Sequence, residues 1–148
     1  MYAVNLETDN YPEVAAELES RLIRFNETAA GPLQTRYIAL TVRDERGALV
    51  GGLTGEAFWG ALHVDLLWVD QAYRGLGYGR SLLQRAEHIA AENSCRLVYL
   101  STFDFQAPAF YAKHGYRRIG ELRDVPQGSR RLWFSKTLPV TYESPRTC

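Results

Sequence analysis

The sequence predicts a mixed α/β (α+β) fold, in which helices cover the faces of one sheet. Three observations lead to this prediction. Antiparallel strand patterns come first, a strand–helix–strand–helix–strand series follows, and a glycine-rich turn opens the first helix of that series. With 148 residues, the chain is long enough for one domain that buries its own core. We expect this domain to span residues 1–138 and residues 139–148 to form a C-terminal tail.

The composition of the chain excludes several classes of protein. The 17 lysines and arginines balance 17 aspartates and glutamates, which argues against a general nucleic-acid binder because phosphate backbones select clustered positive charge. No apolar run approaches the roughly 20 residues of a membrane span, and the first residues lack the pattern of a secretory signal. Two cysteines, Cys95 and Cys148, make neither a disulfide framework nor a zinc cluster. We therefore expect a cytoplasmic protein that uses no metal and binds neither nucleic acid nor membrane.

The N-terminal part of the chain is predicted to contain strands and one helix. Weak alternation over Tyr2–Leu6 predicts a short first strand. Pro12 suits the first turn of a helix, and apolar residues recur at helical spacing over Glu13–Phe25. A loop follows, and then two strands, Tyr37–Arg43 and Ala48–Trp59, flank a tight turn. Three glycines in the second of these strands predict a bulge or bend there.

The remaining elements alternate between strand and helix. A strongly apolar strand over Ala61–Val69 precedes the glycine-rich turn, and the helix after that turn carries a face of leucines, alanines and isoleucine. The rest of the chain is predicted to form a buried strand, a short helix that begins at a proline, and two final strands, which are residues 96–102, 108–113, 116–122 and 131–138.

The stretch "YRGLGYGRSLLQRAEHIAAE", Tyr73–Glu92, raises a chemical question because alternating glycines lead directly into a helix. Glycine lets a ligand approach the main chain closely, and a helix start offers unpaired N–H groups and a positive dipole end. Such a turn is an anion cradle. Arg74 and Arg80 add charge suited to phosphate. The P-loop and the dinucleotide-binding fingerprint both fail here, because the glycine spacing is wrong for each.

Two sequence blocks fit one known family. Arg74, Gly77 and Gly79 form Arg-x-x-Gly-x-Gly directly after an apolar strand, and "DFQAPAFYAKHGY" resembles N-x-x-A-x-x-[LF]-Y-x-K-x-G-[FY]. Together, in this order and at this spacing, they resemble the coenzyme A loop and the following motif of the GNAT superfamily (GCN5-related N-acetyltransferases), in small single-domain members. The resemblance covers nearly the whole chain. Asp104 departs from it, since the family often has asparagine there, and a carboxylate cannot donate the hydrogen bond that an amide can.

The resemblance implies a mostly antiparallel sheet that splays in the middle, between strands Ala61–Val69 and Arg96–Ser101, with helices on both faces. Acetyl-CoA would lie in the splay, and no metal would be needed. The main chain of Leu67, Trp68 and Val69 would bind pantetheine and polarise the acetyl carbonyl. The glycine turn would hold the pyrophosphate, with Asp104 near it. The residues of this turn are Arg74, Gly75, Leu76, Gly77, Tyr78, Gly79 and Arg80.

The resemblance also implies an activity. Acetyl would move from acetyl-CoA to the primary amine of a small molecule or peptide, by direct attack in a ternary complex. Two alternatives stay open: transfer from another acyl-CoA, and a non-catalytic acyl-CoA-binding module. A homodimer is a further implication, because many family members pair through strand edges.

Four residues are candidates for proton transfer, one as the acid and three as the base. Tyr111 matches the family tyrosine that protonates the leaving thiolate. Asp65 and His63 are candidate bases, because strand alternation puts both on one face with Leu67 and Val69 unless a bulge intervenes. A carboxylate in an apolar strand is expected either to interact with a polar or charged side chain or to have a functional role. Glu56, on the preceding strand, is a third candidate base.

Overall fold

The protein is described here by a computed structural model that covers residues 1–139 and forms two units, residues 1–34 and the part of the chain from Thr35 onward. Each unit is described by itself. All but the first residue of the predicted tail, 139–148, lies outside the described residues. Within residues 1–139, no helix combines the length and the apolar character that a membrane crossing requires.

The first unit contains one helix, α1, Tyr11–Ala30. Pro12 occupies its first turn, as predicted, but the helix continues to Ala30, past the point where a loop was expected. No glycine or proline interrupts this extension, and Gly31, at φ +80, ends the helix with its N–H on the carbonyl of Glu27. The strand predicted over Tyr2–Leu6 does not form. Residues 1–34 contain no second strand with which this segment could pair, and an unpaired strand is not stable.

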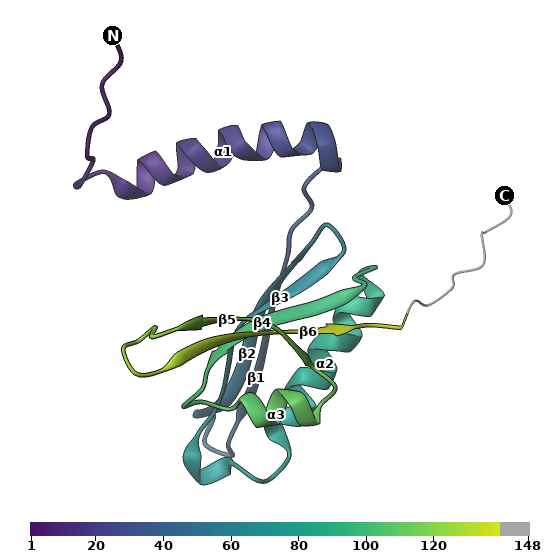
Figure 1. The fold of residues 1–148 in the computed structure, drawn as a ribbon. Coiled ribbons are helices and arrows are strands. Elements are labelled where there is room, and N and C mark those ends of the chain that lie inside the picture. The colour runs from purple at the N-terminus through teal and green to yellow at the C-terminus, as the bar shows by residue number, and fades with distance from the viewer. Residues whose placement is uncertain (140–148) are drawn as a thin grey trace, which may run out of the picture. The chain divides into compact units, whose positions relative to one another are not determined.

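The second unit is built on one sheet of six strands, in the order β1-β2-β3-β4-β6-β5 (Figure 1). All neighbours are antiparallel except β3 and β4, which are parallel. The predicted mixed, mostly antiparallel sheet is therefore confirmed. The strands are β1 Arg36–Arg43, β2 Leu49–Phe58, β3 Ala61–Val69, β4 Leu97–Phe103, β5 Arg117–Arg123 and β6 Arg130–Thr137.

Two helices and a short 3₁₀ turn complete this unit. They are η1 Gln71–Tyr73, α2 Tyr78–Glu92 and α3 Pro108–Lys113. Helix α2 buries the predicted apolar face against β1, β2 and β3, and α3 contributes Tyr111 to the same core. Alternate strand residues complete that core, so α2 and α3 pack on one face of the sheet. We call this the core face. Its fully buried centre includes Leu53, Leu62, Leu83, Val98 and Leu100.

Strands β3 and β4 pair over only three residues each, Ala61–His63 with Leu97–Tyr99. Beyond this point β4 stays paired with β6, and β3 stays paired with β2. The two strands therefore part beyond His63 and Tyr99. This confirms the expected splay, and it leaves the facing edges of both strands without a strand partner.

A bulge in β3 corrects the predicted alternation. Thr54 pairs with Leu66 while Gly55 pairs with Val64, so Asp65 is an extra residue between them. The bulge expected in β2 from its glycines also forms, because Val42 pairs with Gly51 and Arg43 with Leu49, which leaves Val50 as an extra residue beside Gly51. The bulge on β3 was not expected, and Gly55 of β2 supplies the close approach that it requires. Consequently His63 and Leu67 do not share a face.

We call the opposite side of the sheet the second face. On each strand, the residues next to those that point into the core point to this second face. Burial alternates in this way along β2, β3, β4 and β6, and the bulge reverses the alternation within β3. The second-face residues used below are Glu56, His63, Leu66, Trp68, Tyr99, Ser101, Phe103, Arg131 and Trp133.

Candidate active site

The glycine turn has the geometry of an anion cradle. Asp70 accepts a hydrogen bond from the Ala72 N–H at 2.8 Å and thereby starts η1. Gly75 and Gly77 then adopt φ values of +78 and +88, which other residues rarely adopt. Gly77 is the N-cap of α2, and no side chain caps this helix. The first N–H groups of α2 therefore remain available to a ligand.

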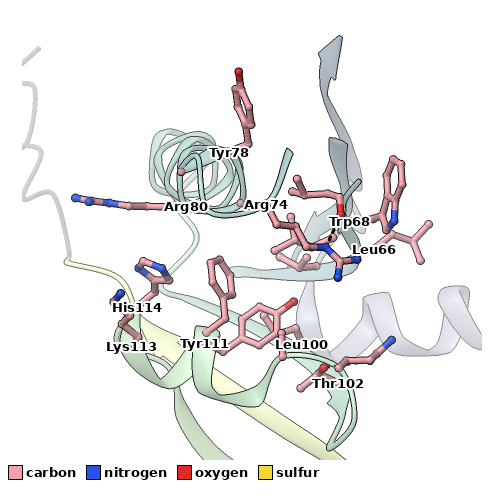
Figure 2. Close-up of a pocket in the computed structure, with 18 of the residues that line it drawn as sticks. Leu66, Trp68, Arg74, Tyr78, Arg80, Leu100, Thr102, Tyr111, Lys113 and His114 are labelled. Carbon is pink, nitrogen blue, oxygen red and sulfur yellow. Dashed lines mark hydrogen bonds between the residues drawn. The ribbon is translucent and has the colours of Figure 1, made fainter. Parts of the chain in front are cut away.

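The two arginines of the turn point in different directions (Figure 2). The Nε of Arg74 donates to the Val69 carbonyl at 3.0 Å, which holds its guanidinium over the end of β3. Arg80 extends from the first turn of α2 toward the side where Lys113, the last residue of α3, and the adjacent His114 lie (Figure 2). Positive charge thus lies at both ends of the cradle.

A cavity of about 840 Å³ connects this cradle with the splay. It is lined by core-face residues such as Leu67, Leu100 and Tyr111, and also by Leu66 and Ser101 of the second face. The cavity therefore extends between the parted edges of β3 and β4. Most of the predicted ligand-binding residues line it, namely Asp65, Leu67, Trp68, Val69, Arg74, Gly75, Gly77, Tyr78, Gly79, Arg80 and Tyr111.

Tyr111 is held in the wall of this cavity by other aromatic rings. Tyr111 is only 7% exposed, and its ring packs against Phe110, Tyr116 and Phe134. Burial raises the pKa of Tyr111 to about 12. The phenol is therefore protonated at neutral pH, and within residues 1–139 its hydroxyl has no hydrogen-bond partner. It can donate to a ligand in the cavity (Figure 2).

His63 lies at the apex of the splay, on the second face, and not in the cavity wall itself. Its ring stacks on Tyr99, with 4.9 Å between the centroids, and its Nδ1 lies 3.8 Å from Oε1 of Glu56. Burial, followed by the negative charge of Glu56, raises the pKa of Tyr99. Asp65, by contrast, is exposed at the bulge and has no ion-pair partner among the described residues.

Comparison with known proteins now decides the family. A sequence model of the acetyltransferase (GNAT) family matches residues 2–116. The chain belongs to the GNAT family. An acetyltransferase of Agrobacterium fabrum is 31% identical over 124 residues, which cover 84% of this chain and 90% of that protein. The solved structure of an acetyltransferase from Bacillus cereus has 37% identity and a TM-score of 0.81, and the match covers 93% of this chain and 98% of the other.

A third relative shares more identity over a shorter segment. The blasticidin-S acetyltransferase of Streptomyces morookaense is 51% identical over 85 residues, which are 57% of this GNAT chain. The match spans 62% of that relative, so less than two thirds of its length is covered.

Two predicted cofactor residues of this GNAT chain lie outside the cavity. Leu76 is 66% exposed in the glycine turn. Asp104 turns toward β6, where its carboxylate lies 3.5 Å from Nε of Arg130 and its N–H donates to the Arg130 carbonyl. Arg130 thus supplies the charge partner that a carboxylate at this position needs.

Gln106 is the residue that sequence reasoning missed. It lines the cavity two residues after Asp104, and its Oε1 accepts from the Phe103 N–H at 2.9 Å and from Thr102 Oγ1 at 3.1 Å. Because a backbone N–H can only donate, the oxygen of the amide is fixed at that position and its NH₂ is available to a ligand. The signal was in the sequence: an amide stands within the motif of this GNAT chain, shifted from the usual position.

Proposed function

We propose that this protein is an N-acetyltransferase that moves acetyl from acetyl-CoA to a primary amine, by direct attack in a ternary complex. One observation carries the proposal. The cavity begins at an anion cradle and extends into the splay, where residues from both faces of the sheet line it, so a cofactor in the cradle can meet an acceptor at the splay. Membership of the GNAT family supports the same reading.

The residues of the cavity fit acetyl-CoA. The uncapped start of α2, with Arg74 and Arg80, suits the pyrophosphate. The unpaired edges of β3 and β4 suit the amide groups of pantetheine, and the Gln106 NH₂ adds a donor. When bound, acetyl-CoA supplies the activated acetyl group and a thiol leaving group. The Tyr111 phenol lies in the cavity wall and can donate its proton to that sulfur.

The acceptor amine must lose a proton, and His63 is the base we propose. It lies at the apex of the splay on the second face, and the Glu56 carboxylate beside it can stabilise the imidazolium that forms. Asp65 is the competing candidate, because it lines the cavity at the bulge. Substitutions that separate the two are given in the Discussion.

A small-molecule amine is the acceptor class we propose. The name of the 51% identical relative indicates that it acts on blasticidin S, which supports an antibiotic-type amine as one acceptor for this chain. Polyamines, amino acids and peptide N-termini belong in the same screen, since each offers a primary amine.

The test is release of free thiol from acetyl-CoA in the presence of a panel: blasticidin S, spermidine, amino acids and short peptides. We expect acceptor-dependent release above the rate with acetyl-CoA alone, and a mass increase of one acetyl group on the amine. Propionyl-CoA and succinyl-CoA replace acetyl-CoA in parallel reactions to test acyl preference. Tight binding of acetyl-CoA with no release for any amine would overturn the enzyme proposal in favour of a binding module.

A further inference from the structure

Arg131 presents a guanidinium on the second face, next to the splay. Its Nε and Nη2 donate to Oγ of Ser101 at 3.0 and 2.9 Å, and Ser101 lines the cavity. The guanidinium carbon lies 5.6 Å from the Phe103 ring centroid and 5.1 Å from that of Trp133. Two aromatic rings and one hydroxyl thus fix the position of this cation.

The neighbouring arginines of the β5–β6 hairpin differ in their partners. Glu121 pairs with Arg118, Arg123 and Arg130, and Asp104 also faces Arg130. Within residues 1–139, Arg131 forms no ion pair with a carboxylate. A guanidinium has five N–H donors, and two of them go to Ser101. Three donors and the full charge therefore remain for a ligand.

The location relates this cation to the proposed reaction. Ser101 follows Tyr99 by two residues on the same face of β4, which is a distance of about 7 Å along the strand. Tyr99 in turn stacks on His63, the proposed base. An acceptor whose amine reaches His63 can therefore extend along β4 to Arg131 within the length of one small molecule.

We propose that Arg131 binds an anionic oxygen group of the acceptor, a carboxylate or a phosphate, so that the preferred acceptor is an amine that carries such a group. The planar fork of the guanidinium matches both groups through paired N–H donors. The inference rests on the proposed acetyltransferase function and adds a specificity-determining residue to it. The negative Glu56 at one end of the second face and the positive Arg131 at the other complement an acceptor of this kind.

Matched acceptor pairs test the proposal. L-lysine and cadaverine differ only in the carboxylate, and O-phosphoethanolamine and ethanolamine differ only in the phosphate. We expect kcat/KM, measured by thiol release, to be about 10- to 100-fold higher for the anionic member of at least one pair. The pair that shows the preference identifies the group. Arg131→Gln should remove that preference through KM and leave the rate for the member without the anionic group nearly unchanged.

Two further variants control for structure. Arg131→Lys keeps the charge but loses the fork, so it should retain only part of the preference. Arg130→Gln changes the adjacent arginine on the same strand and should keep the preference in full. Equal rates for both members of each pair in the parent protein would overturn the proposal and leave the acetyltransferase function standing, as would an equal loss on both members in Arg131→Gln. No thiol release with any amine would instead overturn the function on which it rests.

Discussion

Gly55 and His63 approach across β2 and β3 so closely that a Cβ on Gly55 would lie 2.6 Å from the carbonyl oxygen of His63. The contacted atom belongs to the backbone, so it cannot move without shifting the bulge. We predict that Gly55→Ala lowers the free energy of unfolding by about 1–3 kcal/mol and reduces activity by displacing His63. Gly120→Ala is the control, because its added Cβ meets no atom within 4 Å. Equal denaturant midpoints for both variants would contradict this.

Tyr111 and Tyr116 lie in one aromatic cluster but differ in what their hydroxyls contact. The Tyr116 hydroxyl donates to Oε1 of Glu87 at 2.8 Å, whereas that of Tyr111 lies at the cavity. We predict that Tyr111→Phe lowers kcat by about 10²–10⁴ with little change in melting temperature. Tyr116→Phe should show the reverse, with a loss of about 1–3 kcal/mol in stability because Glu87 loses a donor. Steady-state kinetics and thermal melts on both variants check the pair. A kcat of Tyr111→Phe within about twofold of the parent, far below that range, would assign Tyr111 to packing alone.

The same two tyrosines predict loss of stability in alkali. Burial raises the pKa of Tyr111 to about 12, and burial with the charge and hydrogen bond of Glu87 raises the pKa of Tyr116. Unfolded tyrosine releases its proton near pH 10. Above that pH the folded protein holds more protons than the unfolded chain, so stability falls as pH rises. The slope is up to about 1.4 kcal/mol per pH unit for each tyrosine.

Urea unfolding between pH 8 and pH 12 measures this slope. Below pH 10 the contribution of the two tyrosines is fully present, so the curve should be flat with respect to them. Tyr111→Phe should reduce the slope between about pH 10 and 12, the window set by its pKa. An unchanged slope in that variant would show that other groups cause the alkaline loss.

Gly77 and Gly128 both adopt a positive φ, but they lie in different parts of the fold. Their φ values are +88 and +79, and an added Cβ meets no atom within 4 Å at either residue. Alanine should therefore cost about 1–2 kcal/mol of stability at both. Only Gly77 caps α2 and lines the cavity. We predict that Gly77→Ala raises the Kd for coenzyme A by at least about tenfold, measured by calorimetry, and that Gly128→Ala leaves it unchanged. Equal Kd values would remove the cradle assignment.

His63 and Asp65 can be separated by isosteric changes. We predict that His63→Gln lowers kcat by about 10²–10⁴, because the base is lost, and that Glu56→Gln causes a smaller loss. Asp65→Asn keeps the size of the side chain at the bulge and should have the weakest effect. If Asp65→Asn is instead the variant that loses activity, the base is the carboxylate in the cavity wall. Binding of coenzyme A to each variant, measured separately, excludes a defect in the cradle.

The sequence predicted helices and strands correctly where neighbouring residues determine them. It did not predict features that depend on contacts with residues far along the chain. Strand β3 and helix α3 begin and end where their apolar runs and their proline indicate. The side of the sheet on which Asp65 lies could not be predicted from the sequence. Strand alternation assumes that successive residues point to opposite faces, whereas the bulge at Asp65 on β3 depends on Gly55 of the neighbouring strand. The direction of the Asp104 side chain depended on Arg130, far along the chain. In the same way, the sequence pattern indicates only a solvated strand face for Arg131, because its contact with Ser101 depends on the pairing of β6 with β4.

Two ribbons of three strands each, β1-β2-β3 and β4-β6-β5, are joined by a seam of only three residue pairs. Past that seam each ribbon ends in an open edge, and open edges invite pairing with another chain. A ligand that lies in the splay, between these two edges, shields both of them, and this site forms only in the folded protein. Acyl-CoA should therefore act as a chaperone for this protein: at 100 times its Kd it adds about 2.7 kcal/mol of stability. The cellular concentration of acyl-CoA would then determine the amount of folded protein as well as the rate of the reaction.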